Sequence, residues 1–181
     1  MPENIRDCLR LSSISAIILV ASILILLIAL AFQEIGGFEP CEFCLYQRYP
    51  YAIAIVLSTI SLFISGRLQD RNNLAVFLVA VCSVAFATGA AMALYHVGVE
   101  RSWFQGLASC GGIYGDIKTI EELKARLEIE VAVRCDDVPW SLIGISLAGY
   151  NFLISVILCL GSGLAVMFHF RQRASDENTK T

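Results

Sequence analysis

Two pairs of cysteines are the residues of this sequence whose type and spacing could carry chemistry. Cys41 and Cys44 form a Cys-x-x-Cys motif, and Cys110 and Cys135 follow in the longest polar segment of the chain. Two thiols at this short spacing can form a disulfide and lose it again with little movement of the backbone. We therefore expect thiol–disulfide exchange that involves both pairs.

A static disulfide staple and a zinc site are the other interpretations of these four cysteines. The Cys-x-x-Cys motif closes too short a loop to gain much loop-closure entropy, which disfavours a purely structural role for it. A zinc site usually has two closely spaced pairs, whereas 24 residues separate Cys110 from Cys135. We favour redox chemistry and expect no bound metal, while a stabilising loop disulfide stays open for Cys110 and Cys135.

Several side chains could tune the first pair. If a helix begins near Cys41, then Cys41, Cys44 and Arg48 share one face of it. The helix N-terminus and the guanidinium of Arg48 would then favour a thiolate at Cys44. His96 and Glu100 lie one turn apart further along the chain. A histidine there could donate a hydrogen bond to a quinone carbonyl or be a solvated side chain at the membrane interface.

The elements that hold these residues are expected to be membrane helices. The chain of 181 residues is 57% hydrophobic and 16% charged, and its mean hydropathy is +0.70. This composition excludes an ordinary soluble domain. The sequence predicts an all-α membrane protein, a single four-transmembrane-helix bundle over residues 1–170 with a polar tail at 171–181. The expected helices cover residues 12–33, 46–65, 74–95 and 141–168.

The connections on the cysteine side are the predicted exoplasmic loops 34–45 and 96–140. The second loop contains Thr119-Ile120-Glu121-Glu122, which has the form of a capping box at the start of a helix. We expect a short amphipathic helix there, lying on the membrane surface or packed against the bundle.

Charge predicts the orientation of the chain. The N-terminus, the 66–73 connection and the tail carry seven basic and five acidic residues, whereas the cysteine side carries six basic and eleven acidic residues. By the positive-inside rule both termini are expected in the cytoplasm and the cysteine loops outside, where disulfides persist. Ala29-Leu30-Ala31 resembles a signal-peptidase site, but the apolar run before it is long, so we expect an uncleaved helix. Three further cysteines are expected to be inert: Cys8, Cys82 and Cys159.

A thiol oxidase needs a final electron acceptor. Leu45 follows Cys44, so the haem-binding Cys-x-x-Cys-His motif is absent, as is a dinucleotide-binding glycine motif. A lipid-soluble quinone is the acceptor that a small helix bundle can reach without a soluble domain. We expect no nucleic-acid partner.

With these residues in view, the chain resembles the disulfide bond formation protein B (DsbB) family, quinone-linked thiol oxidoreductases of the bacterial inner membrane. The resemblance runs from the first helix to the fourth. It rests on the order and spacing of these residues: Gly36-Gly37-x-x-Pro40-Cys41-x-x-Cys44-x-x-Gln47-Arg48, Tyr95-His96-x-Gly98-Val99-Glu100, Cys110, Cys135-Asp136-x-x-Pro139-Trp140 and Gly144-x-Ser146.

The resemblance implies a role for each of the predicted site residues. Cys41–Cys44 would be the quinone-linked disulfide, with the Cys44 thiolate facing the ring of a ubiquinone or menaquinone. Arg48 would be the cation that holds this site, and His96 would lie near it.

The resemblance also implies a soluble partner. Cys110–Cys135 would exchange with a periplasmic thioredoxin-fold dithiol oxidase of the DsbA type, with Cys110 in the mixed disulfide. Rival interpretations are a vitamin K epoxide reductase-like quinone reductase, a conduit that carries reducing electrons outward, and a tetraspan structural protein with disulfide-stapled loops.

Overall fold

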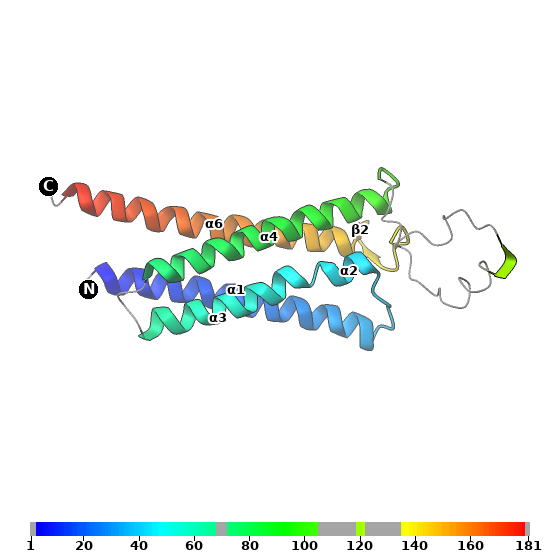
Figure 1. Cartoon of the computed structure of the whole chain (residues 1–181), viewed down its shortest axis with the longest axis horizontal. Coiled ribbons are helices and arrows are strands. Elements are labelled where there is room, and N and C mark those ends of the chain that lie inside the picture. Colours follow the sequence, from blue (N-terminus) through cyan, green and yellow to red (C-terminus); the bar gives the residue numbers. More distant parts are fainter. Residues whose placement is uncertain (1–2, 68–71, 105–118, 122–134, 180–181) are drawn as a thin grey trace.

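The computed structural model describes residues 3–67, 72–104, 119–121 and 135–179, and within them four long helices form an elongated bundle (Figure 1). Their bounds are α1 Glu3–Glu34, α3 Tyr49–Arg67, α4 Asn72–Glu100 and α6 Leu147–Thr179. Four stretches are long and apolar enough to cross a membrane: Leu11–Glu34, Glu42–Ser65, Asn73–Glu100 and Leu147–Ser175. The predicted all-α fold with four membrane spans is confirmed.

The second span consists of two helices. The short helix α2 covers Glu42–Tyr46 and ends at its C-cap Gln47, and α3 begins two residues later. Pro50 explains the interruption, because a proline has no N–H to donate to the carbonyl four residues before it. Proline is well tolerated in the first turn of a helix, where α3 places it.

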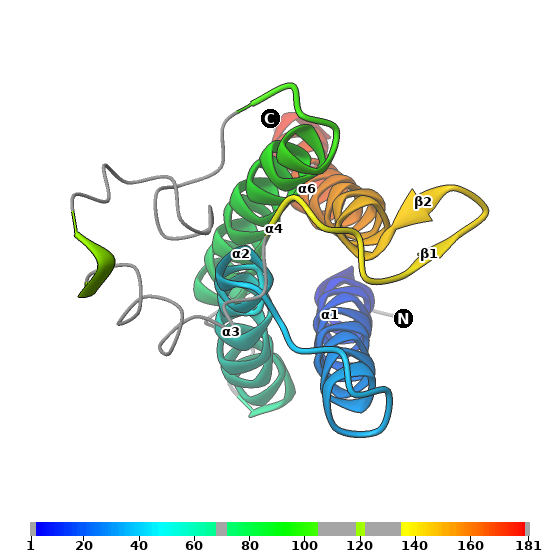
Figure 2. The same cartoon turned by 90° about the vertical axis from the view of Figure 1, so that its right-hand side faces the viewer.

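The four long helices do not pack equally. The helix α3 packs against both α1 and α4, and α4 packs most extensively against α6, whereas α1 and α6 touch over a short stretch only. Seen from the end of the bundle, α1 stands apart from α6 (Figure 2). The seam between α1 and α6 is therefore the loosest side of the bundle.

Small side chains line the close helix contacts. The hydroxyls of Ser15 on α1 and Ser61 on α3 lie 2.9 Å apart, and Ser83 on α4 donates to the carbonyl of Cys159 on α6 across 2.9 Å. A Cβ atom on Gly89 would lie 3.3 Å from the ring of Pro50. Small residues of this kind let membrane helices approach closely, as the spacing of Ala85, Gly89 and Ala93 predicts.

A hairpin replaces the first turn predicted for the fourth helix. Residues 141–146 were expected to be helical, but β1 (Ser141–Leu142) pairs with β2 (Ile145–Ser146), and α6 begins at Leu147. Ile143 and Gly144 connect the strands, both with positive φ angles of 55° and 76°. Two positive φ angles in a two-residue loop are the mark of a type I′ turn, which a helix cannot accommodate.

The cysteine motif and the hairpin lie at one end of the bundle. The start of α1 and the end of α6 lie together at the opposite end (Figure 1). The helix α4 extends to Glu100, so His96 and Glu100 belong to a helix and not to the predicted 96–140 loop. Of the predicted amphipathic loop helix only residues 119–121 are described, and the rest lies outside the described residues.

Candidate functional site

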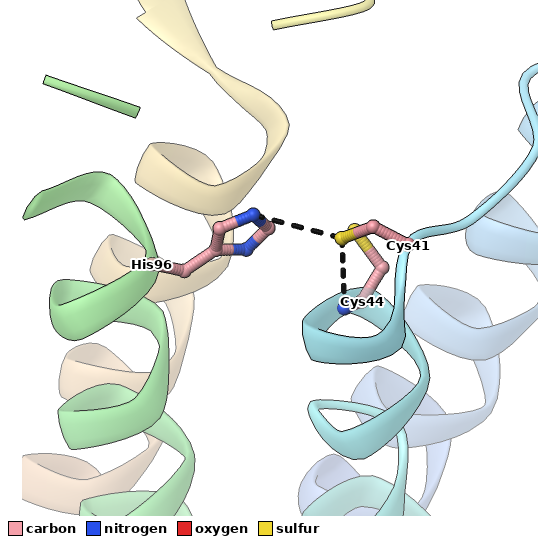
Figure 3. Close-up of side chains that lie close together, drawn as sticks. All are labelled: Cys41, Cys44 and His96. Carbon is pink, nitrogen blue, oxygen red and sulfur yellow. Dashed lines mark hydrogen bonds between the residues drawn. The ribbon is translucent and has the colours of Figure 1, made fainter. Parts of the chain in front are cut away.

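The sulfur atoms of Cys41 and Cys44 lie 3.0 Å apart, and both residues are free thiols. Cys41 is the N-cap of α2 and has an extended backbone, which leaves its side chain free to turn back over the first turn of the helix. Cys44 stands in that turn, so the two sulfur atoms meet above it (Figure 3). Only a small closing movement separates this pair from a disulfide.

Three potential donors converge on the sulfur of Cys41. It accepts the backbone N–H of Cys44 across 3.4 Å, contacts the Cys44 thiol and lies 3.6 Å from Nε2 of His96. Either thiol can donate in the sulfur–sulfur contact, but the other two donors favour Cys41 as the acceptor. The hydrogen bond with Cys44 and, to a lesser degree, that with His96 hold the pKa of the Cys41 thiol well below its usual range, although burial opposes them.

This arrangement differs from the expectation that Cys44 would carry the thiolate. The helix begins at Glu42, one residue after Cys41, so the free N–H groups of its first turn point at the cap and not at Cys44. The guanidinium of Arg48 lines the same cavity as Cys44, but its Nη2 is engaged in a hydrogen bond to Oε1 of Gln33 across 3.0 Å. In the free-thiol pair the negative charge is therefore favoured at Cys41.

His96 reaches the pair from α4. Its side chain is buried, and its ring stacks on Phe43 with 5.4 Å between the ring centres. Nε2 faces Cys41, while Nδ1 lies 3.0 Å from Nε2 of Gln47. The structure thus places His96 beside Cys41, and its predicted place near a quinone stays a prediction.

Cys135 lies beside the same pair. It is 1% exposed and belongs to one buried apolar cluster with Cys41, Phe43 and Val99, against which Cys44 packs. Cys135 is disulfide-bonded. Cys110 lies outside the described residues, so its predicted pairing with Cys135 stays a prediction. One of the two cysteines of the long polar segment, Cys135, therefore packs next to the Cys-x-x-Cys motif.

A cavity of about 200 Å³ opens beside Cys44, at the loose seam between α1 and α6. Its walls are mainly apolar, and its polar or ionisable lining residues are Glu39, Cys44, Gln47, Arg48, Tyr51, Tyr150 and Asn151. The apolar walls include Leu26, Ala29 and Phe32 of α1 and Ala148 and Ile154 of α6. This combination of an apolar cleft with a few convergent polar groups is typical of a small-molecule site.

Four buried or half-buried polar residues near the cysteine pair received no predicted role from the sequence: Gln47, Tyr51, Asn151 and Ser155. They connect α2, α3 and α6 through hydrogen bonds to one another. Their spacing could have indicated them, because polar residues four apart share a face of an otherwise apolar helix.

Cys41, Cys44 and His96 are also the described residues that could together approach one metal ion. Their sulfur and ring-nitrogen atoms lie within 4.8 Å of one another. Thiolates and imidazole are ligands that suit zinc and other soft metals, so the protonation of His96 decides whether the cluster can take one.

Comparison with known proteins supplies a family. A family model described as "Disulfide bond formation protein DsbB" matches residues 12–165. An uncharacterized protein of Rickettsia prowazekii is 26% identical over 161 residues, which cover 88% of this chain and 90% of that one. Two proteins named "Disulfide bond formation protein B" are each 27% identical: that of Polaromonas sp., with 87% of this chain and 92% of its own length covered, and that of Albidiferax ferrireducens, with 90% and 91%. No solved structure gives a significant match.

Proposed function

The chain belongs to the disulfide bond formation protein DsbB family, and from that premise we propose that it is a membrane thiol:quinone oxidoreductase. Membership of this family implies a role in disulfide bond formation. The finer proposal is that the protein re-oxidises a periplasmic dithiol protein of the DsbA type. Its electrons would pass through Cys110–Cys135 and Cys41–Cys44 to a membrane quinone, either ubiquinone or menaquinone.

The first step is exchange with the soluble partner. A thiolate of the reduced partner attacks Cys110 and releases Cys135, which gives a mixed disulfide. The second thiolate of the partner then displaces Cys110. The partner has lost two electrons and two protons as its own disulfide forms, and Cys110 and Cys135 have become thiols.

The second step is exchange between the two pairs of this chain. A thiolate of the reduced loop pair attacks the Cys41–Cys44 disulfide, and the loop disulfide re-forms as Cys41 and Cys44 become thiols. Its support is the burial of Cys135 in one cluster with Cys41, against which Cys44 packs. Cysteines that share one buried cluster are well placed for such an exchange.

The position of Cys44 carries the proposal. The same residue packs against the cluster that contains Cys135 and lines the cavity at the α1–α6 seam. A thiol between a disulfide and an apolar cavity can accept electrons on one side and release them on the other. The geometry thus supports an electron path from the loop pair toward the lipid.

The residues around the cavity fit a quinone. Its apolar walls suit an isoprenoid-bearing ring, and Arg48 is a cation at its polar end. When bound there, a quinone would supply a two-electron, two-proton sink. Cys44 would face it, Arg48 would hold it through charge and hydrogen bonding, and His96 would act from the far side of the pair, through Cys41.

We propose the bacterial inner membrane as the location, with both termini in the cytoplasm and the cysteine loops in the periplasm. The helix ends agree with this arrangement, because the start of α1 and the end of α6 lie at the end of the bundle opposite α2 and the hairpin (Figure 1). The basic residues of the predicted cytoplasmic side support the same orientation.

The test is quinone reduction by the purified full chain in detergent, followed by the ultraviolet absorbance of the quinone, with a reduced DsbA-type protein as donor. Turnover that disappears when any one of the four cysteines is replaced by serine is the expected result. Absence of turnover with every donor and quinone, while the disulfides resist mild reductant, would overturn the proposal in favour of a stapled structural protein.

A further inference from the structure

A continuous row of polar side chains crosses the bundle beside the cysteine pair, and three of its members, Gln47, Tyr51 and Asn151, line the same cavity as Cys44. It runs from Ser155 and Asn151 on α6 through Tyr51 on α3 and Gln47 at the end of α2 to His96 on α4. Gln47, Tyr51, His96 and Ser155 are each at most 5% exposed. Buried polar groups of this kind are almost always hydrogen-bonded, and each bond constrains the next one.

The donor and the acceptor of each hydrogen bond in this row can be assigned, starting at the imidazole of His96. The Nε2 atom of Gln47, which can only donate, lies 3.0 Å from Nδ1 of His96. Nδ1 must therefore accept. Oε1 of Gln47 accepts from Nδ2 of Asn151 across 2.5 Å, so the amide of Gln47 is held at both ends.

The remaining bonds agree with this assignment. Oδ1 of Asn151 accepts from the hydroxyl of Tyr51 across 2.5 Å. The Tyr51 hydroxyl donates its one hydrogen to Asn151. The hydroxyl of Ser155, 2.8 Å away, must therefore be the donor to Tyr51. The opposite assignment would require the amides of Gln47 and Asn151 to be reversed together.

From this chain of bonds we propose that Gln47 and Asn151 are positioning residues that fix the single proton of His96 on Nε2, where it points at Cys41. The inference rests on the proposed thiol:quinone function and goes beyond it by giving a task to two residues outside the cysteine pairs. An imidazole that accepts at Nδ1 carries its hydrogen on Nε2, and Nε2 lies 3.6 Å from the sulfur of Cys41.

This fixed proton has two consequences. His96 is a permanent donor to Cys41, so the negative charge of the reduced pair stays on Cys41 and leaves Cys44 as the thiol that lines the cavity. It also leaves Nε2 without a lone pair for a metal ion, although Cys41, Cys44 and His96 lie close enough together to approach one. The polar row thus disfavours His96 as a ligand to a metal ion at this pair.

The test is nitrogen NMR of the reduced full chain in detergent, with histidine labelled with nitrogen-15. The chain has two histidines, so His169→Gln, in the membrane-embedded part of α6, leaves His96 as the one signal. The expected spectrum is that of a single neutral tautomer, with a pyridine-like Nδ1 and a pyrrole-like Nε2. A proton on Nδ1, a mixture of tautomers or an imidazolium would each overturn the proposal.

Variants then test which residues fix the proton. Gln47→Glu presents an obligate acceptor to Nδ1 and is expected to move the proton there, with the two nitrogen shifts exchanged or both protonated. Gln47→Met and Asn151→Leu remove the constraint and are expected to give a mixture of tautomers, and they supply the result if Gln47→Glu does not fold. Thr88→Val is the matched control, because the Thr88 hydroxyl donates to carbonyls of its own helix α4 and is not part of the polar row. Unchanged shifts in all three folded variants would overturn the assignment of Gln47 and Asn151.

The spectrum is recorded without quinone or partner protein. A wrong tautomer in a chain that turns over would sink this inference alone, whereas the expected tautomer in a chain without turnover would leave it standing and remove the proposed function.

Discussion

Arg48 donates a hydrogen bond from its Nη2 to Oε1 of Gln33 across 3.0 Å, and this bond ties the residue before α3 to the end of α1. The two helices border the same cavity, which Arg48 itself lines. Gln33 therefore holds the guanidinium at the polar end of the cavity, where it can meet an electron-rich ligand without moving.

Replacing Arg48 is expected to weaken quinone binding more than the chemistry. In Arg48→His the shorter side chain carries at most part of the charge, so we expect an apparent KM for quinone about tenfold higher, which corresponds to ~1.4 kcal/mol. The value of kcat should change much less. Gln33→Ala keeps the guanidinium of Arg48 but removes its hydrogen-bond partner, and should give a smaller rise in the apparent KM for quinone. A fall in kcat at unchanged KM would contradict this role.

Cys44→Ser is expected to abolish turnover. A serine hydroxyl cannot form a disulfide with Cys41, so electrons that reach the loop pair have no path to the cavity. Quinone absorbance with a reduced donor measures the loss. Cys159→Ala is the matched control, since Cys159 is a free cysteine of α6 outside the cysteine cluster, and it should keep the parent activity. Normal turnover by Cys44→Ser would sink the mechanism.

The protonation of Cys41 gives a prediction on pH. Its pKa lies below the usual value because of the hydrogen bond with Cys44 and, secondarily, that with His96. His96→Leu removes a donor to the thiolate, a bond worth about 1.5–3 kcal/mol, so the pKa of Cys41 should rise by about 1–2 units. Titration of thiolate ultraviolet absorbance in reduced chains, with and without the substitution, measures the shift.

The sign of the linked stability follows from the same shift. Because the pKa of Cys41 is lower in the folded chain than in the unfolded one, the thiolate bonds stabilise the fold fully above the ordinary thiol pKa. This stabilisation is lost as the pH falls through the lowered pKa. His96→Leu should therefore weaken the dependence of unfolding on pH, and an unchanged dependence would speak against the contact.

We expect that the bundle cannot accept a larger side chain at Gly89. A Cβ atom there would lie 3.3 Å from Pro50 on α3 and 3.5 Å from Ser155 on α6. Gly89→Leu should destabilise the bundle by about 1–3 kcal/mol through overpacking. Gly161→Leu is the control, because nothing lies within 4 Å of a Cβ at Gly161. Unfolding in detergent should distinguish the two variants, and equal stabilities would show that the three helices are not so closely packed.

The proposed orientation can be tested with single cysteines. In a background whose seven cysteines are all replaced by serine, Trp103→Cys should react with an impermeant maleimide in intact spheroplasts. Arg173→Cys should react only after the membrane is opened. Both positions are exposed, and they lie on opposite sides of the predicted membrane. The reverse pattern would place the cysteine loops in the cytoplasm.

Sequence alone predicted the helices well because long uncharged runs have few structural options in a membrane. It missed the hairpin before α6, since Ile143-Gly144 lacks the asparagine or aspartate that usually marks a type I′ turn. It also ended the third helix too early, at the polar residues His96 and Glu100, because nothing in the sequence shows that the His96 ring is buried among helices.

Within the site, the nearness of Cys41 and Cys44 was predictable from their spacing, but the contact of His96 with Cys41 was not. Which of the two cysteines is favoured as the thiolate depends on the residue at which the helix begins. Because α2 begins at Glu42, Cys41 is its N-cap. Gln47 and Asn151 are 104 positions apart in the chain, and only the packing of α6 against the second span brings their amides together.

Cys41 is both a redox sulfur and the cap of a five-residue helix, and this double role bears on the reduction potential of the pair. Bonds to the thiolate stabilise the reduced form, and each bond worth about 1.5–3 kcal/mol would raise the potential by about 30–60 mV. A higher reduction potential of the Cys41–Cys44 pair favours electron transfer from the loop cysteines. It also reduces the potential difference that remains between the pair and the final acceptor. The first turn of α2 would therefore divide the available driving force between the two halves of the proposed cycle.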